Sequence, residues 1–339
     1  MKGLKGMRNR NSERSLPWAT SVAFLCASCL AQAQAQDQLP SWNEGGVKQA
    51  IVDFVAQVSD EDGNDYVPPA ERIAVFDNDG TLWCEQPTYG QVAFILDQIA
   101  KLASDHPEWK TEQPFQAVLE GDMEAVAASG RTGLLKLATA AQSGMTAEEF
   151  DSAVNEWART AQHPRFHRLY TRCVYQPQLE LLEYLKSKGF KTFIVSGGGV
   201  AFMRPWTAQV YGLPRERVVG SRMAAEYQVE GSKRVVLRQP RFDFVNDKEG
   251  KVVGIYQHIG LRPILAFGNS DGDFQMLEYT TGGTGARLGL IVHHTDGERE
   301  YAYDRDSRIG RLRQALDEAD ENGWVVVDMK RDWKQVFPE

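Results

Sequence analysis

The sequence predicts an α/β fold built on a parallel sheet. Short apolar runs typical of buried strands recur along the chain, and segments whose apolar residues follow a helical spacing separate them. Strands that alternate with helices are typical of a parallel sheet covered on both faces. Three of the apolar runs end in loops of small polar residues, which is where open α/β sheets place their ligands.

The individual elements follow from these patterns. The expected strands are residues 73–76, 191–195, 217–220, 263–267, 288–292 and 324–327, with a hairpin over 227–244 that turns at Gly231 and Ser232. The expected helices are residues 47–58, 177–188 and 200–211. Residues 89–161 show helical patterning without a convincing strand, so they predict a helical insert between the first two strands.

Composition limits the class of partner. The 339 residues suffice for one large domain or two modest ones with a sizeable core. The formal net charge of −8 argues against nonspecific binding to nucleic acid or to an anionic membrane. We therefore expect no nucleic-acid partner.

The N-terminal residues differ from the rest of the chain. Five basic residues within the first 14 positions precede an uncharged apolar run at 18–31, and Ala33-Gln34-Ala35 offers a small-x-small cleavage site. This order is typical of a secretory signal peptide, and the apolar run is too short for a good membrane span. We expect residues 1–35 to be removed, leaving a periplasmic or secreted protein without stable membrane insertion. Lipid attachment at Cys29 is the alternative to plain cleavage.

The first predicted strand is followed directly by two carboxylates, Asp77 and Asp79, and then by Gly80-Thr81. Two acids two positions apart on an extended segment point in different directions. One can therefore act as a nucleophile or metal ligand while the other serves as acid and base. An Asx turn that merely closes the strand is the alternative interpretation of this stretch.

Two later strands end in comparable loops, Ser196 to Gly199 and Gly268 to Asp273. Because parallel strands end at one edge of a sheet, these loops should meet the first one there. Glycines after Ser196 let backbone amides approach an anion closely, and the helix that follows favours negative charge at its start.

The order of these motifs resembles the haloacid dehalogenase superfamily of hydrolases, and within it the phosphoserine-phosphatase-like branch. The motifs are Asp-x-Asp-Gly-Thr, a strand ending in Ser-Gly, a lysine, and Gly-x-x-x-x-Asp, and they span about residues 70 to 295. The resemblance implies a Rossmann-like core at 36–84 and 173–339 with an inserted helical cap at 85–172.

The resemblance also implies roles for single residues. Asp77 is the expected nucleophile, Asp79 the general acid and base, and Ser196 a ligand of the transferring phosphoryl group. Further phosphate-binding residues are Gly197, Gly198 and Thr81. Lys251 is the expected partner of the nucleophile and the phosphate, where a positive charge offsets developing negative charge; Lys248 is the alternative.

A magnesium site is implied at the same place. The expected ligands are Asp77, the backbone carbonyl of Asp79, and Asn269, with Asp273 as a direct or water-bridged partner. Asn269 stands where the family usually has an aspartate, and an amide oxygen can serve Mg²⁺ at reduced charge. Asp271 is the alternative ligand if it turns inward.

These expectations define a function: an exported, Mg²⁺-dependent phosphatase that hydrolyses small phosphomonoesters through an aspartyl-phosphate intermediate. A phosphotransferase or mutase of the same superfamily stays open, because it would keep both acids. A noncatalytic periplasmic binding protein is the alternative from another class, although it would be free to lose the nucleophile. A dehalogenase is disfavoured because it needs no acid at Asp79.

Three smaller features have open interpretations. Trp83 and Glu85 either flank a cationic substrate group or form a hinge aromatic and a surface acid. The segment His293-His294-Thr295-Asp296 follows a strand and either binds metal or caps a loop. Cys84 and Cys173 lie on the two linkers of the insert, so a disulfide between them is weighed against two buried free thiols.

Overall fold

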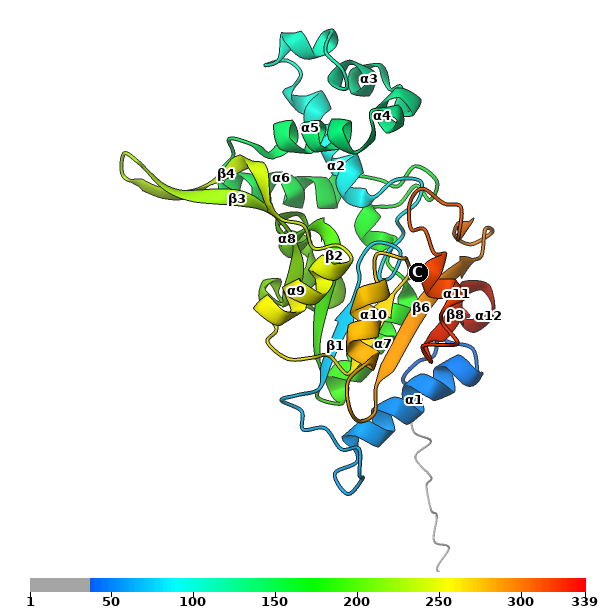
Figure 1. The fold of residues 1–339 in the computed structure, drawn as a ribbon. Coiled ribbons are helices and arrows are strands. Elements are labelled where there is room, and N and C mark those ends of the chain that lie inside the picture. Colours follow the sequence, from blue (N-terminus) through cyan, green and yellow to red (C-terminus); the bar gives the residue numbers. More distant parts are fainter. Residues whose placement is uncertain (1–36) are drawn as a thin grey trace, which may run out of the picture. The chain divides into compact units, whose positions relative to one another are not determined.

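A sheet of mostly parallel strands forms the centre of this computed structural model, which describes residues 37–339 (Figure 1). The predicted signal peptide lies outside the described residues. The strand order is β4-β3-β2-β1-β5-β6-β7, with β8 paired to β6. The strands are β1 Ile73–Phe76, β2 Lys191–Gly199, β3 Val218–Glu230, β4 Lys233–Phe244, β5 Leu265–Gly268, β6 Leu288–Thr295, β7 Ala302–Tyr303 and β8 Val325–Asp328.

Strand β1 occupies the middle of the sheet, and all four of its residues are buried. It pairs in parallel with β2 and β5, and its last residue, Phe76, lies opposite Ile194 and Phe267. This register places the segments that follow the three strands at one edge of the sheet. The α/β class with a parallel core is therefore confirmed, and β4 and β7 are the antiparallel additions.

Helices cover the sheet and form the segment between β1 and β2. They are α1 Gly46–Ser59, α2 Gly90–Leu102, α3 Phe115–Glu120, α4 Met123–Ala128, α5 Gly130–Gln142, α6 Ala147–Thr160, α7 Gln176–Ser187, α8 Val200–Tyr211, α9 Glu249–His258, α10 Phe274–Thr281, α11 Gln314–Asp317 and α12 Met329–Asp332, with short 3-10 turns at Pro107–Lys110, Tyr170–Arg172 and Arg215–Arg217. Helices α2 to α6 fill the predicted insert without a strand. The limits 85–172 of a separate cap domain remain a prediction.

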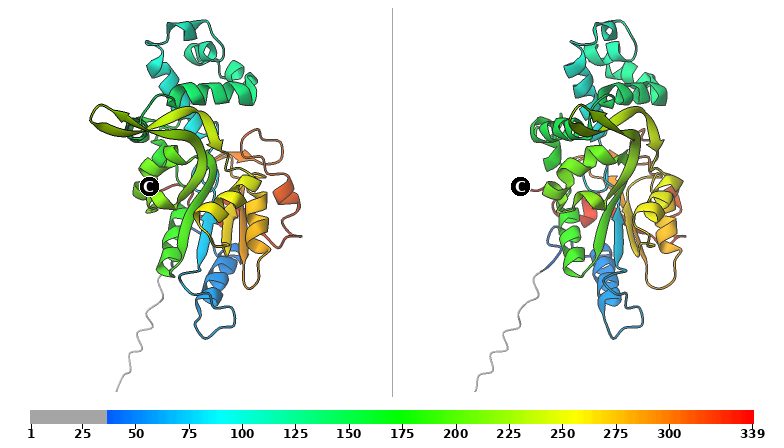
Figure 2. Two further views of the ribbon diagram at one scale, coloured as in Figure 1. Left: turned by 60° about the vertical axis from the view of Figure 1, so that its left-hand side comes forward. Right: turned by 90° about the vertical axis from the view of Figure 1, so that its left-hand side faces the viewer.

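The hairpin of β3 and β4 differs from the expectation. The predicted short strand at 217–220 and the first arm of the hairpin are one continuous strand, because β3 first pairs with β2 and then leaves the sheet to pair with β4. The hairpin also contacts the insert: the backbone N–H of Arg238 donates to the carbonyl of Met145 at 3.0 Å. Figure 2 shows the hairpin running beside the helices of the insert.

The two chain segments that join the insert to the sheet run side by side. The backbone N–H of Cys84 donates to the carbonyl of Cys173 at 2.9 Å, and Trp83 forms an antiparallel bridge with Val174. The thiols of both cysteines are buried and free. The linkers thus lie together as expected, and of the two interpretations of the cysteines the structure has the free thiols.

Within residues 37–339, no helix is both long enough and apolar enough to cross a bilayer.

Candidate active site

The two acids of the first loop are held at the end of β1. The N–H of Asp77 donates to the carbonyl of Phe267 at 2.9 Å, so this residue still belongs to the sheet edge. The chain then turns at Gly80, whose φ of 75° favours glycine. A Cβ at Gly80 would overlap the side chains of Asn269 and Glu85. Both the turn and the close approach of Asn269 and Glu85 therefore require glycine at position 80.

Lys251 reaches Asp77, the predicted nucleophile, from the first turn of α9. Its Nζ lies 2.8 Å from Asp77 Oδ1 and 2.5 Å from Asp273 Oδ1, and the side chain is 2% exposed. Burial opposes its charge, but the two carboxylates raise the pKa of Lys251 above its ordinary value. Lys248 is exposed and makes no such contact. The structure thus brings Lys251, rather than Lys248, to the predicted position.

Asp273 is fully occupied by protein donors. Its Oδ1 pairs with Lys251, and its Oδ2 accepts hydrogen bonds from the N–H groups of Asn269 and Ser270 at 3.0 and 3.1 Å and from Ser270 Oγ at 3.2 Å. In this arrangement Asp273 fixes the third loop and the lysine. Asp271 is also engaged, because its Oδ1 accepts from the N–H groups of Arg313 and Ala315.

The second loop is a strand end rather than a loop, since β2 continues through Gly199. The side chain of Ser196 is buried, and its Oγ accepts from the N–H of Gly198 at 3.0 Å. Two buried side chains fix this backbone from behind: Asn246 Nδ2 donates to the carbonyl of Ser196, and Ser221 Oγ donates to that of Gly197. Helix α8 begins directly afterwards, so its positive end faces the site.

Asn269 is part of a hydrogen-bonded group behind the acids. Its Oδ1 accepts from Thr81 Oγ1 at 3.0 Å, and its Nδ2 donates to Glu85 Oε1 at 2.7 Å. Tyr303 donates its hydroxyl to the same Glu85 oxygen at 2.8 Å. Glu85 is 2% exposed, so the interpretation as a surface acid was wrong. Thr81 is buried and directed at Asn269, not at open space.

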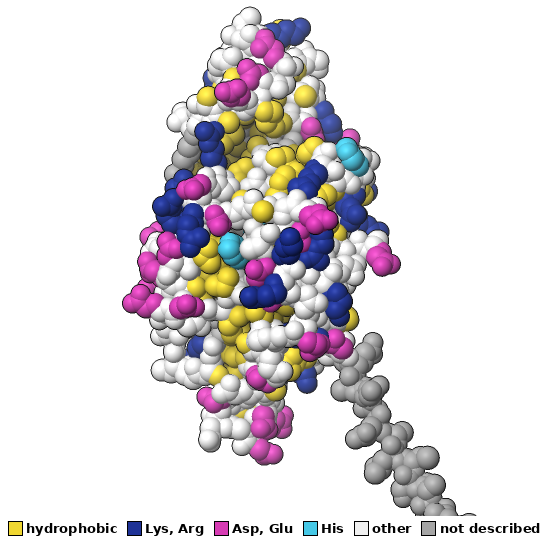
Figure 3. All heavy atoms as spheres, turned by 90° about the vertical axis from the view of Figure 1, so that its right-hand side faces the viewer, with side chains coloured by type: hydrophobic (Ala, Val, Ile, Leu, Met, Phe, Trp, Pro, Cys, Tyr) yellow, Lys and Arg dark blue, Asp and Glu magenta, His cyan; other side chains and the backbone are white. Residues whose placement is uncertain are grey.

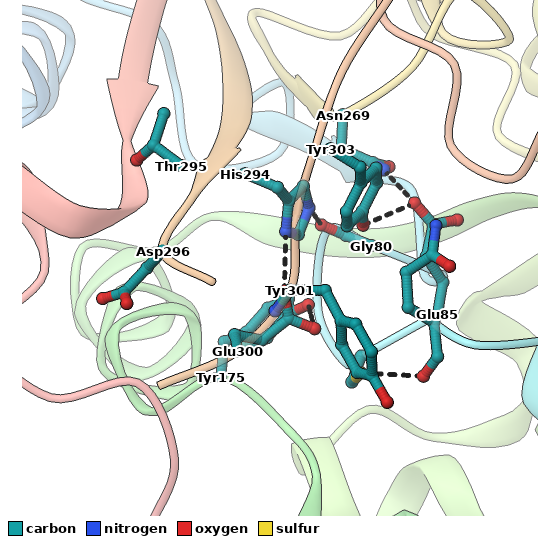
Figure 4. Close-up of polar contacts among 12 residues, drawn as sticks. Gly80, Glu85, Tyr175, Asn269, His294, Thr295, Asp296, Glu300, Tyr301 and Tyr303 are labelled. Atoms are coloured by element: carbon teal, nitrogen blue, oxygen red, sulfur yellow. Dashed lines mark hydrogen bonds and ion pairs between the residues drawn. The ribbon is translucent and has the colours of Figure 1, made fainter. Parts of the chain in front are cut away.

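His294 supports the first loop from β6 (Figure 4). Its Nε2 faces the carbonyl of Gly80 at 2.8 Å, its Nδ1 faces Glu300 Oε2 at 3.2 Å, and its ring stacks on Tyr303. A ring nitrogen that faces a carbonyl must carry the proton, so Nε2 donates. Of the two interpretations of this histidine, the structure has the one that caps a loop.

Burial sets the electrostatics of the acids. It is the main cause that raises the pKa of Asp77 to about 7, followed by repulsion from Asp273, while Lys251 acts in the opposite direction. Burial likewise raises the pKa of Asp79, and it raises the pKa of Glu85 well above its ordinary value. The site thus concentrates desolvated carboxyl groups whose protonated forms are favoured, and Lys251 contacts two of the carboxylates, Asp77 and Asp273.

Trp83 lies on the chain segment that joins β1 to the insert. It is fully buried, its Nε1 donates to Asp79 Oδ1 at 2.9 Å, and its ring stacks on Trp206 with centroids 4.7 Å apart. Its face is therefore not free for a cationic ligand. It orients Asp79 instead.

A cavity of about 740 Å³ opens over these residues. Asp77, Asp79, Ser196, Lys251 and Glu85 line one part of it. Helices α2 and α5, helix α8 and the β3–β4 hairpin line the rest. Sequence reasoning proposed Asp77, Asp79, Ser196 and Lys251 for this part and left the role of Glu85 open. It did not predict the apolar walls, because they come from segments whose contacts leave no short motif.

Comparison with known proteins gives one family. The model of the haloacid dehalogenase-like hydrolases matches residues 74–278, which is more than half of the chain. No curated protein sequence matches.

Solved structures with similar folds have low sequence identity. A conserved, functionally unknown protein from Anaerococcus prevotii is 16% identical, with 83% of this chain and 91% of that chain covered and a TM-score of 0.53. A protein of unknown function from Bordetella pertussis is 16% identical, with coverages of 76% and 99% and a TM-score of 0.48. A phosphoserine phosphohydrolase-like protein from Francisella tularensis is 18% identical, with coverages of 67% and 89% and a TM-score of 0.37.

Proposed function

Because the chain belongs to the haloacid dehalogenase-like hydrolases, we propose that it is a phosphatase that hydrolyses small phosphomonoesters through an aspartyl-phosphate. The observation that carries this proposal is the placement of Asp77 and Asp79 at the end of β1, with Lys251 2.8 Å from the first acid. Both acids line the same cavity as Ser196 and the glycines that follow it.

The chemistry uses the two acids in turn. A carboxylate oxygen of Asp77 attacks phosphorus, and the bond from phosphorus to the leaving oxygen breaks. Asp79 gives its proton to that oxygen, and its raised pKa suits a group that must hold a proton beforehand. Asp79 then takes a proton from water as the water attacks phosphorus, so the bond to Asp77 breaks and inorganic phosphate leaves.

The second loop is suited to the phosphoryl oxygens. The end of β2 offers Ser196 and the backbone of Gly197 to Gly199, and helix α8 directs its positive end there. Lys251 adds a fixed charge next to Asp77. Donors that are already held in place stabilise developing negative charge without a cost of reorganisation.

The donor set fits Mg²⁺. Asp77, the carbonyl of Asp79 and the Asn269 oxygen are hard oxygen donors, and the buried carboxyl groups Asp77, Asp79 and Asp273 outnumber Lys251 beside them. Among the described residues, no three His, Cys, Asp or Glu side chains form a metal cluster, so the set mixes a carboxylate with amide and backbone oxygens. When bound, Mg²⁺ would neutralise negative charge on the phosphoryl group. Asp273 supports the site through Lys251.

Export is a separate part of the proposal. It rests on the basic, apolar and small-residue order of residues 1–35. Mass spectrometry of the protein from the native host should find a chain that begins near Gln36 in the periplasmic or culture fraction. A full-length product in the cytosolic fraction would refute export.

Phosphate release from a panel of phosphomonoesters, with Mg²⁺ and with a chelator, tests the activity. We expect release with Mg²⁺ from p-nitrophenyl phosphate and from alkyl phosphates, and its loss in Asp77→Asn. Transfer of the phosphoryl group to an added alcohol or sugar phosphate, with little free phosphate, would indicate a transferase instead. Absence of both reactions would refute the proposal.

A further inference from the structure

The cavity extends far beyond the phosphoryl site. Its volume of about 740 Å³ lies in the upper part of the usual range for small-molecule sites. A phosphoryl group with a leaving group of a few atoms would fill a small fraction of it. The remaining walls must therefore contact a larger leaving group of the substrate or remain hydrated.

These walls are apolar and come from four elements. The apolar side chains that line the cavity are Val92, Ile95, Leu96, Leu134, Leu135, Leu137, Ala138, Val200, Ala201, Phe202, Met223, Phe242 and Val245. Among the described residues, eleven large hydrophobic side chains are exposed, and Leu134, Leu135, Phe242 and Val245 are four of them. Apolar side chains that stay accessible together on one concave surface mark a binding site. Figure 3 shows one face of the molecule, where hydrophobic side chains reach the surface in the upper part and again lower down.

Most polar side chains on these walls have partners within the protein, as when Arg204 Nε donates to the carbonyl of Arg215 at 3.0 Å. Gln91 Oε1 accepts from the N–H of Gly199 at 2.7 Å, and Gln142 Oε1 accepts from Arg238 at 2.9 Å. Arg222 forms an ion pair with Asp243. Groups with such partners offer little for recognition, so most of the accessible wall surface is hydrocarbon.

The acids that line the cavity all lie at its catalytic part. They are Asp77, Asp79, Glu85 and Asp247. The part formed by α2, α5 and the hairpin contributes no carboxylate to the lining. A cationic leaving group would therefore find no counter-charge there, and a strongly polar one would leave its hydrogen bonds unmet.

From this distribution we infer that the substrate is a phosphomonoester of a bulky apolar alcohol or phenol, with the hydrocarbon against α2, α5 and the hairpin. The inference rests on the proposed phosphatase function and specifies its substrate class. Each methylene moved from water to these walls adds about 0.8 kcal/mol of binding, or roughly fourfold.

A series of unbranched alkyl phosphates tests the inference, because the reactivity of the leaving oxygen changes little while the apolar area grows. We expect kcat/KM to rise about fourfold per added methylene from methyl to hexyl phosphate. A kcat/KM that stays constant or falls with chain length overturns the inference, while the proposed phosphatase function still holds. If no compound, including p-nitrophenyl phosphate, releases phosphate, the proposed function falls with it.

Two variants on different elements locate the effect. In Leu135→Asn on α5 and Phe242→Ser on the hairpin, the ratio of kcat/KM for hexyl over methyl phosphate should drop about tenfold. Both side chains are partly exposed, 38% and 37%, so folding should survive, and circular dichroism checks it. Leu261→Asn, at a site that is 42% exposed and outside the cavity lining, should keep the wild-type ratio. Wild-type ratios in both cavity variants would overturn the inference.

Discussion

The two parts of the cavity are built in opposite ways. At the end of β1, almost every polar atom has a partner: Lys251 holds Asp77 and Asp273, Asn269 joins Thr81 to Glu85, and His294 holds the carbonyl of Gly80. On the side of the insert, partly exposed side chains such as Leu135 and Phe242 present hydrocarbon with few directional contacts.

The difference indicates a division of labour. A hydrogen-bonded network of buried charges fixes atoms in one geometry, which chemistry at phosphorus requires. Apolar walls select by size and by desolvation, and they tolerate variation in shape. Changes in the first part should therefore affect reaction, metal binding or stability strongly, whereas changes in the second should affect the choice among substrates.

Removal of the nucleophile should give the largest effect. Asp77→Asn keeps the shape of the side chain but loses its nucleophilic charge, so kcat should fall by at least about a thousandfold for every substrate. Steady-state phosphate release measures the loss, and Asp53→Asn on the exposed face of α1 is the matched control. Turnover within tenfold of wild type in Asp77→Asn would rule out the covalent route.

Stability of the metal-free protein should depend on pH through the buried acids. The pKa of Asp77 is about 7 when folded, against 3.8 for the ordinary group, so the folded chain holds a proton that the unfolded chain has released. This contribution is complete below about pH 4 and is lost as pH rises through 7, by up to roughly 4 kcal/mol. Urea unfolding in a chelator measures it.

Asp77→Asn should flatten that decline, because the amide does not titrate. Added Mg²⁺ should also reduce it, since a bound cation favours the ionised carboxylate. A free energy of unfolding that rises between pH 5 and 7 in the metal-free wild type would contradict the assigned direction.

Loss of the loop support should destabilise the fold. His294→Ala leaves the buried carbonyl of Gly80 without its donor, which should cost about 2–3 kcal/mol of unfolding free energy. It also removes one partner of the buried Glu300, which keeps its contacts with Tyr175 and the N–H of Tyr301. Denaturant unfolding compares it with His258→Ala, a change at an exposed position of α9. Equal stability of the two variants would show that the loop does not depend on this contact.

The contact between the neutral Asn269 and the buried Glu85 should give the smallest effect, which is on Mg²⁺ binding. If Glu85 supplies negative charge that Asn269 lacks, Glu85→Gln should weaken Mg²⁺ binding about tenfold, as measured by calorimetry. Asn269→Asp in the Glu85→Gln background should restore the affinity, because the negative charge returns on the side chain that contacts position 85. The exposed Glu71→Gln is the control. Unchanged affinity in Glu85→Gln would remove Glu85 from the metal site.

The sequence predicted the charged part better than the apolar part, for a physical reason. Apolar runs such as residues 73–76 identify buried strands, and parallel strands bring their following loops together without any knowledge of side chains. Asp77 and Ser196 could therefore be placed from these patterns, whereas Lys251 followed from the resemblance to the family. The family is confirmed by the matching residues 74–278.

The rest depends on contacts across long separations. Glu85 reads as a surface acid in a polar stretch, and only its partners Asn269 and Tyr303, far along the chain, reveal its burial. The contact of Arg238 with Met145 that brings the hairpin to the insert leaves no local pattern either. Contacts between residues far apart in the sequence determine both features.

The most direct test of the central claim is to look for the covalent intermediate. The enzyme is mixed with p-nitrophenyl phosphate and Mg²⁺, quenched in acid during turnover, digested, and analysed by mass spectrometry. We predict a phosphorylated peptide that contains Asp77, absent from Asp77→Asn and removed by hydroxylamine, which cleaves acyl phosphates. Turnover with no phosphate on Asp77 at any quench time, or phosphate on another residue, would contradict the account.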